Sequence, residues 1–253
     1  ENVSVDRMGN VVARKPGRVP GAARVMLCAH MDEVGFIVND ITEDGYLKFA
    51  PVGGIDPRVV IGKRVSVGRG RIPGAIGLKA YHLVSAEEEK KVPDFEDLYI
   101  DIGAKDRADA EAVTALGDLV AFESDAVEFG SGMLKAKALD DRVGCYNMLR
   151  LMEERYPVSV VYAFTVQEEV GLRGARTAAF AAAPDFGIAV DVTLTGDTKG
   201  AKPMAVSLGK GAAVKLKDAS VICDGYLAKK MASIAEKQKI PSQKEILTSG
   251  GSD

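Results

Sequence analysis

The sequence has no tryptophan, two histidines and three cysteines among its 253 residues. Cys28, Cys145 and Cys223 are odd in number and far apart, and no Cys-x-x-Cys pair occurs, which indicates a reducing compartment. Long apolar runs are also missing. No stretch approaches the roughly 18–20 residues that span a bilayer, and no signal-peptide pattern is present. These absences predict a cytoplasmic protein without a membrane partner.

Charge of one sign is not in excess either. Lys and Arg total 33 against 36 Asp and Glu, which gives a formal net charge of −3. Nucleic acids are bound by clustered and excess Lys and Arg, so no nucleic-acid partner is expected. Hydrophobic residues at 47% and charged residues at 27% are typical of a globular protein that can bury a sizeable core.

The residue pattern predicts an α/β fold with an inserted β domain. Short apolar runs separated by glycine turns indicate a small β barrel or sandwich over residues 36–127. Residues 1–35 and 128–253 would form one discontinuous α/β domain. The expected strands are Arg24–His30, Gly35–Val38, Val59–Ile61, Arg64–Val67, Leu98–Ile102, Val158–Val166 and Phe186–Val190, and the expected helices are 106–116, 142–154, 172–183 and 226–239.

One histidine and two acidic clusters follow expected strands. His30 and Asp32 are two residues apart and lie on the same side of an extended chain. Asp32 could therefore accept the second ring N–H and orient the imidazole for a metal, although a buried histidine with satisfied hydrogen bonds is the alternative. Glu168 and Glu169 end an apolar strand, where one could bind metal while the other takes a proton. A solvated strand end is the alternative there.

Two further acidic positions have similar surroundings. Asp140 and Asp141 precede an expected helix, where an N-cap and a first-turn acid explain them as well. Asp191 ends another core strand, where capping is again the alternative. One histidine with several carboxylates is a mixed nitrogen and oxygen ligand set that suits Zn, Co or Mn. A bridging carboxylate would allow two ions about 3.5–4 Å apart, as in hydrolytic two-metal sites.

At these residues the sequence resembles the co-catalytic metallo-aminopeptidases of the tetrahedral-aminopeptidase and glutamyl-aminopeptidase family, some of which are labelled endoglucanases or cellulase-like. The resemblance implies a mixed-sheet, zinc-peptidase-like catalytic domain that removes N-terminal residues from peptides, and an inserted dimerisation domain. The usual assembly of the family is a tetrahedral dodecamer. The matching stretches are Val5–Val11, Ala29–Phe36, Gly77–His82, Asp97–Ala104, Ala138–Gly144, Gln167–Gly174, Asp191 and Gly250–Asp253.

The resemblance also implies a metal-ligand set at the matching positions. Asp140 would bridge two divalent metal ions, His30 and Asp191 would complete one of them, and Glu169 would serve the other. In the family, the second metal-binding histidine follows the Gly-Gly-Ser-Asp segment with which this sequence closes. The other histidine, His82, lies in the insert. We therefore expect the native polypeptide to extend beyond both ends of this sequence.

Catalytic roles follow from the same resemblance. Glu168 would be the general base, and Asp32 would orient the metal-binding histidine. Asp141 would follow a strained or cis peptide bond that aims the bridging carboxylate.

Other functions compete with this interpretation. A deacylase or carboxypeptidase could use the same metal site, and a non-catalytic shell subunit could have lost a metal. A glycosidase is disfavoured because its two carboxyl groups face each other across a sugar, roughly 5–9 Å apart, whereas Glu168 and Glu169 are adjacent. The sequence does not specify which N-terminal residue is removed.

Overall fold

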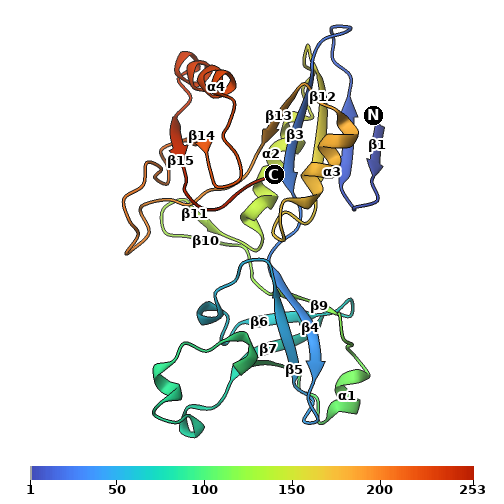
Figure 1. Cartoon of the computed structure of the whole chain (residues 1–253), viewed down its shortest axis with the longest axis vertical. Helices are drawn as coiled ribbons and strands as arrows, with labels where there is room; N and C mark the ends of the chain where they lie inside the picture. Colours follow the sequence, from blue (N-terminus) through green and yellow to red (C-terminus); the bar gives the residue numbers. More distant parts are fainter. Residues whose placement is uncertain (1) are drawn as a thin grey trace. The chain divides into compact units, whose positions relative to one another are not determined.

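The computed structural model describes residues 2–253, whose contacts form two compact units (Figure 1). The chain leaves the first unit after Met31, returns to it at Asp140 and leaves it again for Glu169–Gly171. We call the first the α/β unit and the second the barrel unit. The domain boundaries drawn from the sequence, with 36–127 as the insert, stay a prediction.

A five-stranded mixed sheet is the centre of the α/β unit. β12, β3 and β13 run parallel, whereas β2 pairs antiparallel with β12, and β1 with β2. The parallel register places Thr165 beside His30, so the carboxyl ends of these strands meet at one edge, where ligands bind in such sheets. The strand order is β1 (Asn2–Val5), β2 (Val11–Lys15), β12 (Ser159–Thr165), β3 (Arg24–His30) and β13 (Phe186–Ala189).

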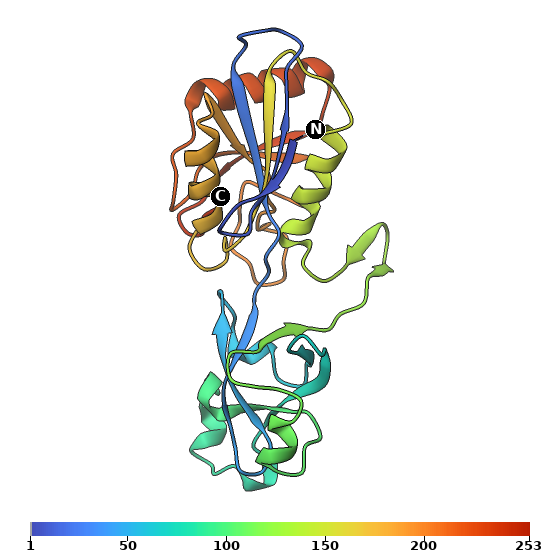
Figure 2. The ribbon, with the colours of Figure 1, turned by 90° about the vertical axis from the view of Figure 1, so that its right-hand side faces the viewer.

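Helices cover both faces of this sheet, with α2 (Leu139–Leu151) on one face and α3 (Arg173–Ala182) on the other (Figure 2). Met148 of α2 joins Tyr162 in one buried cluster, and Ala178 of α3 joins the cluster on the opposite face. Burying a side chain such as Met148 contributes about 1.5–3 kcal/mol. Coverage of both faces explains why β12 is an almost unbroken apolar run.

A smaller layer completes the α/β unit. β14 (Ala212–Lys217) and β15 (Ser242–Ile246) pair in parallel, and α4 (Gly225–Gln238) packs against them. The carboxylate of Asp224 caps α4 by accepting the N–H of Leu227 at 2.8 Å, because the first amides of a helix have no partner within it. None of the helices formed by residues 2–253 has the length and apolar character needed to cross a bilayer.

Six strands of the barrel unit close on themselves through antiparallel pairs. Leu47, Leu98 and Ile100 are fully buried within this barrel, and the rings of Phe36 and Phe49 pack edge to face at 4.8 Å between centroids. Closure pairs the strand edges that an open sheet would expose. In barrel order the strands are β4 (Gly35–Ile41), β5 (Leu47–Val52), β8 (Leu98–Asp101), β7 (Ile72–Leu78), β6 (Arg64–Val67) and β9 (Leu119–Phe122).

Short elements connect the strands of the barrel unit. They are the helix α1 (Arg107–Glu111) and the 3₁₀ turns Pro57–Val59, Tyr81–Leu83, Glu88–Lys90 and Phe95–Asp97. A hairpin of β10 (Val127–Phe129) and β11 (Met133–Lys135) follows the last barrel strand, β9.

The predicted fold class, an α/β catalytic domain with a small β barrel, is confirmed, but two elements were predicted wrongly. Val59–Ile61 is not a strand. Pro57 and the Asp56 carboxylate, which accepts the N–H of Arg58 at 2.9 Å, begin a 3₁₀ turn that reaches this segment. The helix expected over 106–116 ends at Glu111.

Asp118 explains the early end of that helix. Its carboxylate accepts hydrogen bonds from the Thr114 hydroxyl and the Ala115 amide, both at 3.0 Å. Side-chain oxygens that capture nearby backbone amides in this way compete with continued helix formation.

Candidate metal centre

His30 is the last residue of β3 and is 2% exposed. Its strand lies between β12 and β13, so the imidazole is surrounded by residues that follow these two neighbours. A buried imidazole costs free energy unless its nitrogens have partners. Carboxylates surround one of the two nitrogens here, since three acidic side chains lie within 4 Å of the Nε2 atom.

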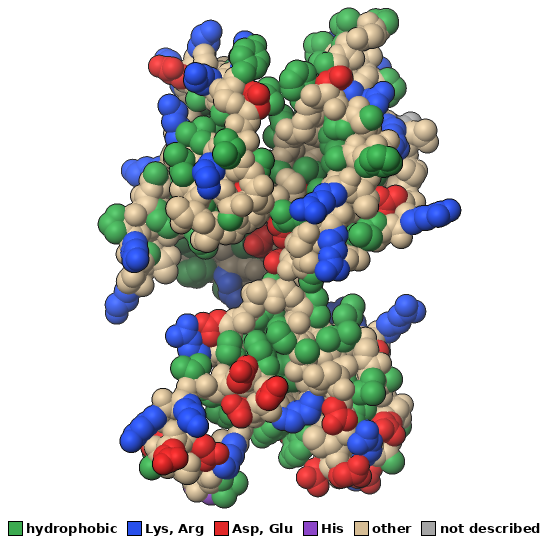
Figure 3. Space-filling view, viewed as in Figure 1, with side chains coloured by type: hydrophobic (Ala, Val, Ile, Leu, Met, Phe, Trp, Pro, Cys, Tyr) green, Lys and Arg blue, Asp and Glu red, His purple; other side chains and the backbone are tan. Residues whose placement is uncertain are grey.

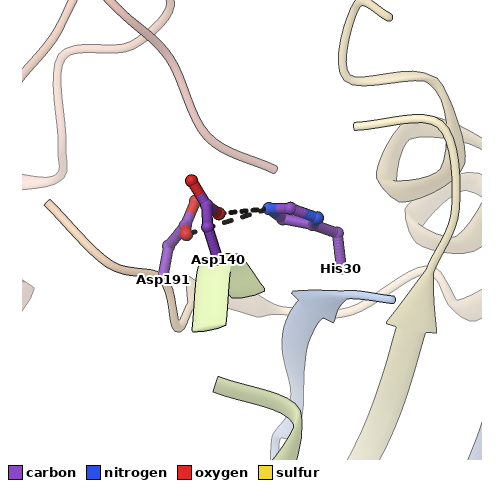
Figure 4. A group of neighbouring side chains, drawn as sticks. All are labelled: His30, Asp140 and Asp191. Carbon is purple, nitrogen blue, oxygen red and sulfur yellow. Dashed lines mark hydrogen bonds and ion pairs between the residues drawn. The ribbon is translucent and has the colours of Figure 1, made fainter. Parts of the chain in front are cut away.

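Asp140 and Asp191 direct their carboxylates at the same ring nitrogen (Figure 4). The His30 Nε2 atom is 3.0 Å from Asp140 Oδ1 and 3.9 Å from Asp191 Oδ1. One donor atom from each of the three residues lies within 4.8 Å of the others. The Asp140 side chain is 57% exposed, which leaves part of its carboxylate accessible from outside the protein.

Glu168 is the third acid near this nitrogen. It lies three residues after β12, and its Oε2 atom is 3.9 Å from His30 Nε2. Its side chain is only 10% exposed. The structure therefore brings four of the residues selected from the sequence together in the α/β unit: His30, Asp140, Glu168 and Asp191.

Asp32 and Glu169, the other two selected residues, belong to the barrel unit by their contacts. The backbone N–H of Glu169 donates to Asp32 Oδ2 at 3.3 Å. This hydrogen bond holds the backbone of Glu169 against the side chain of Asp32. The orientation of His30 by Asp32 and the metal-ligand role of Glu169 stay predictions.

Ser252 is a site residue that sequence reasoning missed. Its hydroxyl donates to Asp191 Oδ2 at 2.6 Å, while the N–H of Val192 donates to Asp191 Oδ1 at 2.7 Å. The neighbouring carboxylate of Asp253 accepts a hydrogen bond from the Thr165 hydroxyl. The Gly-Gly-Ser-Asp motif was the available signal, because it matched the resembling family without being given a role.

Asp141 supports the metal centre from inside the protein. It is fully buried, and its Oδ1 atom accepts the Gly144 N–H at 3.1 Å. Burial, followed by the negative charge of Asp191, raises the pKa of Asp141 to about 7. The peptide bond between Asp140 and Asp141 is cis, as the family resemblance implied. Both acids lie at a non-helical kink in the first turn of α2, which begins soon after β11 ends at Lys135.

Gly144 allows α2 to approach this buried carboxylate. A Cβ atom at Gly144 would lie 2.4 and 2.5 Å from the two Asp141 carboxylate oxygens and 2.5 Å from the backbone oxygen of Val190. Non-bonded heavy atoms normally stay about 3.5–4.0 Å apart. No side chain larger than hydrogen therefore fits between the helix and these oxygens.

The donor atoms suit a hard or borderline divalent cation, since they are one imidazole nitrogen and carboxylate oxygens. Acidic side chains are exposed in a group near one end of the α/β unit (Figure 3), and such a group attracts positive charge. Burial raises the pKa of Cys28 to about 12 and that of Cys145 to about 11, and neither cysteine belongs to a group of possible metal ligands among the described residues.

Comparison with known proteins gives one consistent family. The family described as M42 glutamyl aminopeptidase matches residues 9–253. A protein of Acetivibrio thermocellus that carries an aminopeptidase name is 42% identical over 255 residues, covering 100% of this chain and 74% of its own length.

Solved structures agree with this assignment. Aminopeptidase APDkam598 of Desulfurococcus kamchatkensis has a TM-score of 0.93 and 36% identity, covering 100% of this chain and 72% of its own. The TET1 peptidase of Pyrococcus horikoshii, which can assemble into a tetrahedron or a large octahedral shell, has a TM-score of 0.86 and 35% identity, with coverage of 100% and 76%.

Proposed function

This chain belongs to the M42 glutamyl aminopeptidase family, and we propose that it removes N-terminal residues from peptides by a two-metal mechanism in which Glu168 is the general base. Membership of the family makes it a peptide hydrolase that uses divalent metal. The observation that carries the proposal is the convergence of Asp140, Glu168 and Asp191 on one buried histidine nitrogen. The cations would be Zn, Co or Mn.

The proposed ligands divide between two cations. His30 and Asp191 would hold the first, Glu169 would hold the second, and Asp140 would bridge them. Partial exposure of Asp140 supports the bridging role, because one carboxylate oxygen can face the imidazole while the other remains accessible. When bound, the cations supply positive charge that acidifies the attacking water and stabilises negative charge on the scissile carbonyl oxygen.

Glu168 would move the proton in this reaction. Its carboxylate accepts a proton from the water and then gives it to the leaving amine. Its side chain is nearly buried, and electrostatic interactions are stronger in such a low-dielectric setting than in water. Ser252 keeps the Asp191 carboxylate oriented through the 2.6 Å hydrogen bond. Asp32 would orient the imidazole, as inferred from the sequence spacing.

Metal removal and a substrate panel test the proposed function. The proposed site can catalyse hydrolysis only when it holds a divalent cation. Exhaustive chelation should therefore abolish cleavage of aminoacyl anilides, and Zn, Co or Mn should restore it. The panel should include N-acylated aminoacyl anilides and peptides with blocked N-termini, which a deacylase or a carboxypeptidase would cleave. Full turnover in the chelated protein would contradict the metal mechanism. Cleavage confined to the blocked substrates would contradict the aminopeptidase assignment.

The proposed function includes self-association through the insert, up to a tetrahedral dodecamer. The barrel is closed, so open strand edges do not explain pairing. The support is exposed apolar surface, including Tyr81, Leu83 and Val92 on one segment of the barrel unit, together with the assembly of TET1 peptidase into a tetrahedron or an octahedral shell. Large exposed apolar groups often mark interaction surfaces.

Light scattering tests the assembly with a matched pair of substitutions. Leu83 in the barrel unit is 61% exposed and Leu208 in the α/β unit is 58% exposed. Leu83→Asp should lower the scattering mass, because a charge buried at an interface is costly, and Leu208→Asp should leave the mass unchanged. A wild-type chain that remains monomeric at all concentrations would rule out the assembly.

A further inference from the structure

Glu168 is carried by the segment from Val166 to Gly174, which runs from the end of β12 into the first two residues of α3 and is called the loop below. Two residues of this loop other than glycine have left-handed backbones, Gln167 at φ 62° and Leu172 at φ 55°. Side chains with a Cβ disfavour this region, so such conformations persist only where neighbouring contacts hold them. The contacts that hold this loop therefore determine where the Glu168 carboxylate lies.

Asn10 makes the contacts at both ends of the loop. It is fully buried at the end of the turn between β1 and β2. Its Oδ1 atom accepts the N–H of Val166 at 3.0 Å, and its Nδ2 atom donates to the backbone oxygen of Gly174 at 3.0 Å. One side-chain amide thus joins the two ends of this loop, although Asn10 is more than 150 residues away from the loop in sequence.

The loop ends are in close contact around this amide. A Cβ atom at Gly174 would lie 2.2 Å from the Val166 backbone oxygen and 2.5 Å from Asn10 Oδ1. Within the loop, the N–H of Leu172 donates to the Glu168 backbone oxygen at 2.9 Å. The amide, the glycine and the internal hydrogen bond leave little freedom for the segment that carries Glu168.

Asp6 fixes the orientation of the Asn10 amide. Asp6 Oδ2 accepts from Asn10 Nδ2 at 2.7 Å, and Asp6 Oδ1 accepts the backbone N–H groups of Met8, Gly9 and Asn10 at 2.8, 3.0 and 3.0 Å. Burial pushes the pKa of Asp6 upward, but these hydrogen bonds outweigh it and hold the pKa below its usual value. An ionised Asp6 accepts only, so the NH₂ group of Asn10 faces it and the Oδ1 atom faces Val166.

We propose that Asn10 is a positioning residue that holds both ends of the 166–174 loop and thereby places the Glu168 carboxylate for proton transfer. This inference rests on the proposed function, in which Glu168 is the general base. Asn10 acts only through the loop and touches no reacting atom. A misplacement of about 1 Å can cost roughly 10²-fold in rate, so loss of this clamp should appear mainly in kcat.

Hydrogen exchange in the metal-free protein tests the clamp independently of activity. In Asn10→Ala, the amides of residues 166–174 should exchange about 10-fold to 100-fold faster, because both hydrogen bonds at the loop ends are lost. Met26→Ala is the control, since Met26 is a buried residue of β3 that is absent from the loop contacts. It destabilises the fold without selectively loosening the loop. Unchanged loop exchange in Asn10→Ala overturns the proposal.

Kinetics test the link to Glu168. Asn10→Ala should lower kcat about 10-fold to 100-fold with KM within twofold of wild type, whereas Met26→Ala should keep kcat per folded molecule. In a Glu168→Gln background, Asn10→Ala should cause no further loss of kcat, because effects through one group are not additive. Equal losses in both backgrounds overturn the positioning role. Full turnover of Glu168→Gln alone would instead refute the proposed base, and the exchange result on the clamp would still stand.

A second variant covers failure of Asn10→Ala to fold. Asn10→Ser removes the amide without placing a second carboxylate beside Asp6, and its shorter side chain does not reach both ends of the loop. The amides of residues 166–174 should again exchange faster than in the wild type, and unchanged exchange there would contradict the contacts described here.

Discussion

Replacing Glu168 by glutamine is expected to lower kcat by about 10²- to 10⁴-fold, the usual effect of losing a general base, while the metal content stays at the wild-type value. Glutamine has nearly the same shape but cannot accept a proton at neutral pH. The Glu168 carboxylate is 3.9 Å from His30 Nε2, compared with 3.0 Å for the Asp140 carboxylate. Asp191, a proposed ligand, is also 3.9 Å from this nitrogen, so the metal content of the variant is the measurement that distinguishes a base from a ligand.

Steady-state kinetics and metal analysis of the same protein sample check this result. Glu153→Gln, which alters an exposed acid in an ion pair with Arg150, is the control and should leave kcat unchanged, since surface pairs of this kind contribute little. Near-normal turnover in Glu168→Gln would require another base. Loss of both turnover and metal would instead make Glu168 a ligand.

Replacing Asp140 by alanine is expected to remove bound metal together with activity. The proposed bridging carboxylate would serve both cations, so its loss would weaken two sites at once. It would also remove the carboxylate nearest the His30 imidazole, at 3.0 Å. Equilibrium dialysis with Zn or Co should show less than one ion per chain. The dissociation constant should rise at least about 100-fold, because loss of a ligand should weaken binding more than the roughly 10–100-fold loss caused by mutating residues that only support a ligand.

Asp125→Ala is the matched control, since Asp125 is an exposed acid paired with Arg64 in the barrel unit. It should bind metal as the wild type does. If Asp140→Ala kept two ions per chain, the bridging assignment would be wrong. Loss of one ion only would show that the carboxylate serves a single cation.

Local pattern was enough to predict much of the fold and to select three acids that the structure brings within 4 Å of the His30 Nε2 atom, whereas their roles at a metal centre came from the family resemblance and stay predictions. Arg24–His30 was predicted as a strand with its observed bounds, because a buried parallel strand has a short apolar run and no helical spacing. Glu168 could be selected because two adjacent carboxylates at the end of such an apolar strand are unusual, and Asp191 was selected only in combination with the other acidic positions. The sequence could not show that both face the same nitrogen of His30, since that depends on strand order.

Contacts between distant segments were the part that could not be predicted. Asn10 lies in a turn and has no local feature that reveals its bonds to Val166 and Gly174. Ser252 likewise lacks any local pattern that points to Asp191. In both cases a polar side chain forms a hydrogen bond with a group that is far away in sequence, so only the folded chain identifies the two partners.

The insertion of the barrel unit also determines the order in which the strands can pair during synthesis. The barrel strands lie within one continuous stretch, from Gly35 to Phe122, whereas β3 pairs with β12, whose residues Ser159–Thr165 emerge more than a hundred residues later. Contacts between strands so distant in sequence are slow to form, because the closure of a long loop must precede them. On the ribosome the barrel can close while β3 and His30 still lack a partner strand on the β12 side, so the acids around His30 reach it only after β12 and the residues that follow it have been made.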